Sequence, residues 1–187
     1  MCSVLSTLSR SLLKRDYYVL KFNSRGVGQS GGWSSLTGMS ESKDLEALVL
    51  WALNNIEDVA DVVFIGYSHG ALITSLHPTL PAPLNTRHIL ISYPLGVRGL
   101  ITLFRTGSYA ASLSTLLRDP TSNVLVVYGT QDEFTSEQSY NSWAGKLSTE
   151  VGDGTGRLEV HKVEDANHFW AGAARQELVR AVEGWLP

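Results

Sequence analysis

A serine between two glycines follows an apolar run in the segment VVFIGYSHGAL. The pattern is G-x-S-x-G over residues 66–70, with Ser68 at its centre. Val62–Gly66 predicts a buried strand and a helix is predicted to begin near His69, which is the context of a nucleophile elbow. Such a sharp turn strains the serine backbone and projects its hydroxyl at the carboxyl end of the strand. The alternative is an ordinary strand-to-helix turn that contains a serine.

A serine nucleophile needs a general base and an acid that orients the base. Asp132 stands just past the apolar run Val124–Gly129, and the adjacent Glu133 is a second candidate for the acid. His168 follows the last predicted strand and precedes the last predicted helix. We therefore expect Ser68, Asp132 and His168 to lie on loops at one edge of a parallel sheet, where ligands bind in open α/β sheets.

The residues on either side of Ser68 are predicted to line the same site. The main-chain N–H of His69 stands at a helix N-terminus, where it can face a developing oxyanion. Its ring matters less for this role, and Tyr67 is a candidate for contact with substrate.

The remaining histidines favour no metal centre. His77 and His88 flank a proline-rich turn and are interpreted as surface or core residues. His161, Asp165 and His168 are close in sequence, but His161 lies within a predicted strand and no matching group of ligands occurs elsewhere. We predict no metal ion and no other cofactor.

The segment RGVGQSGG contains Gly26, Gly28 and Gly31 at the spacing G-x-G-x-x-G, which can indicate dinucleotide binding. That fingerprint requires a strand directly before the first glycine and a helix beginning within the motif. Here three residues separate the glycines from the predicted strand, and the next helix is predicted only from Ser40. A tight glycine turn at the edge of the sheet is the interpretation that remains.

Apolar β-rich runs alternate with helical patterns, which predicts an α/β fold: a mostly parallel sheet with helices on both faces, in a single domain over residues 1–187. Ser40 is the predicted cap of the first long helix. The predicted strands are Tyr17–Phe22, Val62–Gly66, His88–Ser92, Val124–Gly129 and Leu158–Val163. The predicted helices run from Ser40 to about Asn55, from near His69 to Pro78, and over Ser136–Leu147 and Gly172–Trp185.

Composition narrows the classes of partner. The 187 residues carry a net charge of −3, which makes nucleic acid an improbable partner, and no apolar run approaches the roughly 20 residues of a membrane span. Cys2 is the only cysteine, so an internal disulfide is impossible and a cytoplasmic location is the default. The first fifteen residues favour an amphipathic helix with Val4, Leu5, Leu8 and Leu12 on one face, although their serines and basic residues also resemble a transit peptide.

These motifs together resemble the α/β-hydrolase superfamily, and within it the small lidless hydrolases related to dienelactone hydrolases and serine aminopeptidase-like proteins. FNSRGVGQSGG is similar to the segment after the fourth strand of that family, GYSHG to its elbow, YGTQDEF to its acid loop and ANHFW to its histidine loop. The resemblance implies Ser68 as nucleophile, Asp132 as orienting acid and His168 as base. It also implies that the glycine segment is a turn beside the active site.

One departure from the family leads us to expect an N-terminally truncated sheet. The family has three strands before its first helix, and a glycine-bearing loop after the third supplies an oxyanion N–H. In this chain Met1 falls where that loop should end. The chain is then a fragment, or the neighbouring strands pair directly, or another chain donates a strand. His69 N–H alone is half an oxyanion hole, and losing one donor costs about 10²–10³ in turnover. The N–H groups of Asn23–Gly28, including that of Gly26, are candidate replacements.

The function that these observations predict is hydrolysis of an ester, thioester or amide through an acyl-enzyme, with a small-molecule acyl substrate. Phe169, beside His168, is a candidate for the substrate pocket. The apolar residues between the strands at 88–92 and 124–129 either wall an apolar acyl pocket or simply cover the sheet; they are Leu100, Leu103, Phe104 and Tyr109. The alternatives are a catalytically weak or inactive hydrolase-like binding module and an acyltransferase that uses the same residues. A homo-oligomer is possible.

Overall fold

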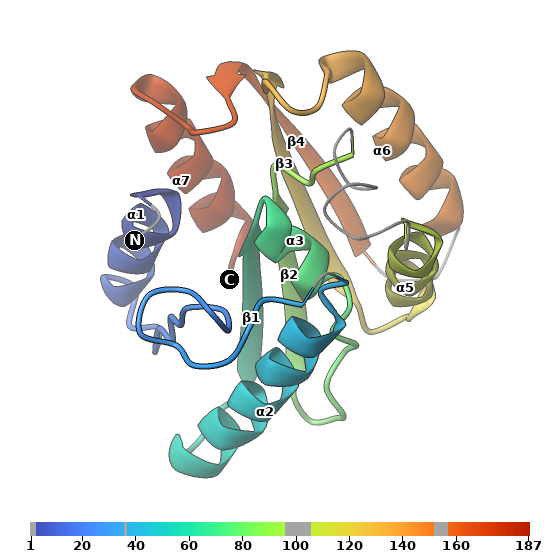
Figure 1. Ribbon diagram of the computed structural model, residues 1–187. Coiled ribbons are helices and arrows are strands. Elements are labelled where there is room, and N and C mark those ends of the chain that lie inside the picture. Colours follow the sequence, from blue (N-terminus) through green and yellow to red (C-terminus); the bar gives the residue numbers. More distant parts are fainter. Residues whose placement is uncertain (1–2, 36, 96–105, 152–156) are drawn as a thin grey trace.

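A parallel sheet forms the centre of the molecule (Figure 1). The computed structural model describes residues 3–35, 37–95, 106–151 and 157–187. In that part of the chain the four strands, in the order in which they lie side by side, are β1 (Asp61–Tyr67), β2 (Asn85–Ile91), β3 (Asn123–Gln131) and β4 (Arg157–Asn167). Every neighbouring pair is parallel, so the loops that follow the strands meet at one edge of the sheet. The predicted mostly parallel sheet is confirmed.

Helices cover both faces of this sheet, as the alternating sequence pattern predicts. Residues of α1 (Ser3–Leu13) and α7 (Ala173–Trp185) pack on one face, against Ile89 and Leu125. Residues of α3 (His69–Thr74), α5 (Thr106–Arg118) and α6 (Glu137–Val151) pack on the other face, against Leu90 and Val126. Successive strand residues point to opposite faces, so the continuous apolar runs of β2 and β3 fill both cores. The predicted amphipathic helix is found as α1, with Val4, Leu8 and Leu12 buried.

The helix α2 (Met39–Asn55) begins differently from the prediction. Ser40 lies inside the helix, and the cap is Gly38, whose φ of 70° suits glycine. The hydroxyl of Tyr109 lies where a Cβ of residue 38 would stand, and it donates a hydrogen bond to the carbonyl of Thr37. The prediction of a serine cap is therefore wrong, because close packing against α5 requires glycine at this turn.

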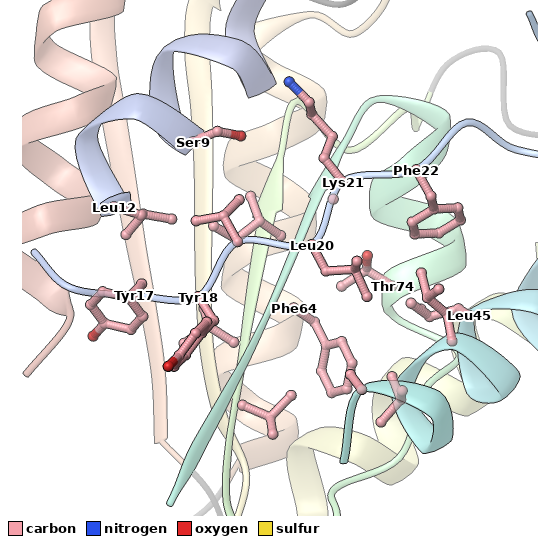
Figure 2. A pocket seen from close by; sticks show the side chains of 18 of the residues that line it. Ser9, Leu12, Tyr17, Tyr18, Leu20, Lys21, Phe22, Leu45, Phe64 and Thr74 are labelled. Atoms are coloured by element: carbon pink, nitrogen blue, oxygen red, sulfur yellow. The ribbon is translucent and has the colours of Figure 1, made fainter. Parts of the chain in front are cut away.

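The predicted strand Tyr17–Phe22 is also wrong. The segment is extended but forms no ladder with β1, and Tyr18, Leu20 and Phe22 are exposed. A sequence with strand propensity becomes a strand only where a neighbour supplies hydrogen-bond partners for its backbone. Among the described residues no strand lies beside this segment. Leu20 of this segment and Phe64 of β1 line the same cavity, and both are labelled in Figure 2.

An apolar cavity of about 560 Å³ lies along the edge of β1 that faces away from β2. Side chains of α1, α2, β1, α3 and the segment 17–22 line it, among them Leu8, Leu45, Phe64, Ile73 and Leu20. The side chains of β1 pack into apolar clusters on both faces of the sheet, as predicted for Val62–Gly66, but most of its residues are only half-buried. Burial is incomplete because no strand covers the outer edge of β1 in the described part of the chain.

Candidate active site

The turn between β1 and α3 holds Ser68 in a strained conformation, with φ 54° and ψ −123°. A side chain at Gly66 would collide with the main chain of α3, because its Cβ would stand 2.6 Å from the Cα of Ala71 and closer still to the carbonyl oxygen of Gly70. Glycine at 66 therefore lets the strand and the helix approach. A Cβ at Gly70 would meet open space, so the close approach of strand and helix requires glycine only at position 66.

The structure brings Ser68, His168 and Asp132 into one chain of hydrogen bonds. The Oγ of Ser68 lies 3.0 Å from Nε2 of His168, and Nδ1 of His168 lies 2.7 Å from Oδ2 of Asp132. Asp132 and His168 are buried. Ser68 comes from the elbow, Asp132 from the loop after β3 and His168 from the loop after β4. These three residues thus meet at one edge of the sheet, as their positions after the strands predict.

Asp132 is held as a carboxylate. Burial alone raises its pKa, but the hydrogen bond with His168 and those from the main-chain N–H groups of Phe134 and Thr135 outweigh burial. The pKa of Asp132 therefore lies below its usual value, and the side chain is ionised at neutral pH. A hydroxyl of Tyr140 also donates to Oδ2, at 3.3 Å. An ionised carboxylate at Nδ1 fixes the tautomer that leaves Nε2 free to accept a proton.

Glu133, the second candidate for the acid, does not contact the imidazole ring in the structure. Its Oε2 instead accepts a hydrogen bond from the main-chain N–H of His168, at 2.8 Å. Tyr67 also reaches the histidine loop: its hydroxyl donates to the main-chain carbonyl of His168 at 2.9 Å, and its ring centroid lies 5.4 Å from that of His168. The sequence does not reveal these contacts, since neither follows from the spacing of the residues.

Two exposed aromatic rings border the imidazole. The rings of Phe134 and Phe169 both stand edge-on to His168, with centroids 4.7 and 5.7 Å away, and each is about half exposed. Phe169 is thus near the site, as predicted. Phe134 was missed, although it lies two residues beyond Asp132 in the same loop. Trp170, next to Phe169, is instead fully buried and donates from Nε1 to Ser92.

The main-chain N–H groups of the glycine loop are partly used for hydrogen bonds within the loop itself. The N–H of Gly26 donates to the carbonyl of Gly31, and that of Val27 donates to Ser24, each at 3.1 Å. The side chain of Asn23 packs against Gly28. The N–H of Gly26 is therefore engaged and is not a free oxyanion donor, contrary to its prediction. Ser24 of the same loop lines the cavity beside β1, as do Tyr67 and Gly70 on either side of the elbow.

The predicted wall of a substrate pocket is only partly described. Leu100, Leu103 and Phe104 lie outside the described residues. Tyr109 is fully buried in the core on one face of the sheet and contacts the start of α2, so of the two alternatives it covers the sheet.

The large cavity beside β1 is distinct from the chemistry around Ser68. It reaches Tyr67 and Gly70, but Ser68, Asp132 and His168 are not among the residues that line it. Within the described ranges, no group of three or more histidine, cysteine or acidic side chains is placed to hold a metal ion. Nor does any helix in that part of the chain have the length and apolar character to span a membrane.

Solved structures of serine hydrolases share this architecture. The lidless α/β serine hydrolase XC6422 from Xanthomonas campestris superposes with a TM-score of 0.71 and 24% identity, over 100% of this chain and 75% of that chain. A serine hydrolase homologue from Coxiella burnetii (TM-score 0.68, 24% identity) is matched over 97% of this chain and 76% of its own. The esterase Pf2001 from Pyrococcus furiosus superposes with a TM-score of 0.70 and 22% identity, over 97% of this chain and 75% of that chain. The chain therefore has the α/β-hydrolase fold.

Sequence comparison adds one relative of unassigned function. An uncharacterized protein of Schizosaccharomyces pombe, C959.06c, is 30% identical over 126 residues, which are 65% of this chain and 52% of the relative. The chain thus spans about half the length of the curated relative that it matches. No protein-family model matches the chain.

Proposed function

We propose that the protein is a serine hydrolase that cleaves an ester, thioester or amide through a covalent acyl-enzyme. The observation that carries this proposal is the continuous chain of hydrogen bonds from Ser68 through His168 to the ionised Asp132. It stands on a fold that solved serine hydrolases share.

Each residue has a defined part in the reaction. His168 accepts the proton of the Ser68 hydroxyl through Nε2 as Oγ attacks the carbonyl carbon of the substrate. The main-chain N–H of His69 donates to the oxyanion that forms. His168 then passes the proton to the leaving group, and in the second half it deprotonates the water that hydrolyses the acyl-enzyme. Asp132 orients the imidazole and stabilises its charged form.

Phe134 and Phe169 suggest an apolar group on the substrate. Their rings flank the imidazole and are about half exposed, so an apolar acyl or leaving group can pack on them while its carbonyl lies at Ser68. A bound apolar group also excludes water from His168, which strengthens the hydrogen bonds of the triad.

Labelling with a fluorophosphonate probe tests this function, because the probe reacts with activated serine nucleophiles. We expect the wild type to label and Ser68→Ala and His168→Ala to remain unlabelled, while the matched variant Ser142→Ala, which changes an exposed serine of α6, labels normally. Hydrolysis of short p-nitrophenyl esters follows the same order. A folded wild type that neither labels nor hydrolyses these esters overturns the proposal.

A second candidate function, binding without catalysis, is favoured by the cavity along β1. The outer edge of this strand has no partner strand in the described residues, and the cavity beside it is apolar. An extended apolar segment of another chain can add a strand at such an edge. Amide hydrogen exchange of Val62–Ile65, with and without a hexapeptide of alternating valine and threonine, tests this candidate: slower exchange supports it, and unchanged exchange excludes it.

A further inference from the structure

The main chain of His168 is held at both of its polar groups. Its N–H donates to the carboxylate of Glu133 at 2.8 Å, and its carbonyl accepts from the hydroxyl of Tyr67 at 2.9 Å. Glu133 directly follows Asp132, and Tyr67 directly precedes Ser68. The triad side chains therefore contact the ring of His168, while their immediate neighbours in sequence contact its backbone.

The segment around His168, from the end of β4 into the loop that follows, has a conformation that needs such support. Asp165 and Trp170 both have positive φ, 56° and 54°, which costs free energy for residues other than glycine. Other contacts fix these two residues: the N–H of Asp165 donates to Thr130, and the indole N–H of Trp170 donates to Ser92. Glu133 and Tyr67 hold the residue between them, on which the position of the imidazole depends.

We propose that Glu133 and Tyr67 are positioning residues that clamp the backbone of His168, so that Nε2 keeps its distance to Ser68 throughout the reaction. The inference rests on the proposed hydrolase function. Glu133 is exposed, so packing alone does not keep its carboxylate at this position. A carboxylate that accepts from a main-chain N–H forms a charge-assisted hydrogen bond, stronger than a neutral one.

The expected loss is kinetic. A displacement of a catalytic group by about 1 Å costs up to about 100-fold in rate, so a loosened loop lowers kcat while substrate affinity stays. We expect Glu133→Ala and Tyr67→Phe each to lower kcat on a p-nitrophenyl ester about tenfold, with KM within about twofold of the wild type. Glu177→Ala, which removes an exposed acid of α7, serves as the matched control and keeps wild-type kcat.

The conservative variant Glu133→Gln distinguishes an effect on the position of His168 from an effect of the negative charge of Glu133. Glu133→Gln retains an oxygen that accepts the His168 N–H but carries no charge, so it keeps kcat within about threefold and an unshifted pH profile of kcat/KM. Melting temperatures confirm that every variant is folded. Wild-type kcat in Glu133→Ala overturns the clamp. An equally impaired Glu133→Gln with a displaced pH profile also overturns it, because the charge and not the position then matters.

Amide hydrogen exchange, followed by NMR, tests the clamp without relying on turnover. Exchange of the His168 amide is expected to rise about tenfold or more in Glu133→Ala, while the amide of Asp165, bonded to Thr130, is unchanged. This result supports the clamp even if the wild type fails to react with a fluorophosphonate, which is the outcome that overturns the hydrolase function. A His168 amide that exchanges freely in the wild type overturns the clamp and leaves fluorophosphonate labelling as a separate result.

Discussion

The two sides of Ser68 differ in how completely they are built. On the side of the histidine loop, Asp132, Glu133 and Tyr67 hold the ring and the backbone of His168 with hydrogen bonds of 2.7 to 2.9 Å. On the other side, the edge of β1 borders an apolar cavity, and the extended segment beside it forms no ladder. The groups that we propose to move protons are therefore fixed, whereas only the main-chain N–H of His69 is proposed as a donor to an oxyanion.

Because of this difference, substitutions on the two sides are expected to affect different properties, activity on one side and stability on the other. In the proposed reaction, residues on the histidine side contact the reacting atoms or the group that transfers the proton, so changing them is expected to lower activity. Residues on the β1 side pack the strand, the elbow and α3 together, so changing them mainly lowers the free energy of unfolding. Variants on the two sides test whether this division holds.

Removal of the base is expected to have the largest effect. His168→Ala leaves Ser68 without a proton acceptor, and we expect kcat/KM for a p-nitrophenyl ester to fall about 10⁴-fold or more. His161→Ala, a histidine change within β4, serves as the control and stays within about twofold. Steady-state kinetics measure both, and a loss below about tenfold for His168→Ala contradicts the role of base.

Loss of the orienting charge ranks next. Asp132→Asn places an amide against Nδ1, which favours the wrong tautomer of His168 and removes the charge that stabilises the imidazolium. We expect kcat to fall about 10³- to 10⁴-fold with a small change in KM. If Glu133 takes over as the acid, the loss is less than about tenfold, and the assignment of Asp132 from its 2.7 Å contact is then wrong.

Acid is expected to destabilise the β1 side through a buried histidine. His88 is fully buried, its ring lies against that of Phe64 in the cavity wall, and its Nε2–H donates to the carbonyl of His77. Burial lowers its pKa from 6.5 to about 4. Between these values the unfolded chain binds a proton that the folded chain does not. The free energy of unfolding contributed by this group is therefore complete above pH 6.5 and is lost as the pH falls toward 4.

Urea unfolding between pH 7 and 4.5 measures this dependence. His88→Gln keeps an amide at the His77 carbonyl but does not titrate, so we expect its free energy of unfolding to fall less steeply than that of the wild type, by up to a few kcal/mol over the range. Parallel curves for the two proteins contradict the prediction. A remaining slope in the variant is expected, because burial also lowers the pKa of His77 and His69.

The two glycines of the elbow are expected to differ sharply. Gly66→Ala forces a Cβ into the main chain of α3, which destabilises the fold by about 1–3 kcal/mol. Gly70→Ala adds a methyl group in open space within a helix, where alanine is favoured by up to about 1 kcal/mol. Thermal unfolding measures both changes. Equal melting temperatures for the two variants mean that the elbow is looser than its close contacts imply.

The sequence predicts the histidine side well because its signals are local. Ser68 stands in a short motif after an apolar run, and Asp132 and His168 each follow a strand, so parallel pairing alone brings them to one edge. The roles of Glu133 and Tyr67 were not predictable in this way. They depend on which way a side chain points across a loop that is distant in sequence.

The β1 side was predicted poorly because its structure depends on neighbours. Strand-like composition occurs in two segments on this side, Val62–Gly66 and Tyr17–Phe22. Composition does not specify how many strands lie beside a segment. The first became an edge strand and the second an extended segment without a ladder. Likewise, Ser40 has the chemistry of a cap, but the packing of Tyr109 against Gly38 decided where α2 begins.

The smallest effect on activity is expected for His69, the residue after Ser68. Replacing it by alanine, as for His168, compares a histidine on each side of Ser68. His69→Ala removes the ring and keeps the main-chain N–H, and burial lowers the pKa of this ring, so it is neutral at pH 7 and adds no charge to an oxyanion. We expect kcat within about threefold of the wild type, against a loss of about 10⁴-fold for His168→Ala. Steady-state kinetics at pH 7 decide the comparison. A loss above about 30-fold assigns the ring of His69 a direct contact with substrate, and the β1 side then contributes a side chain to the chemistry and not only a main-chain donor.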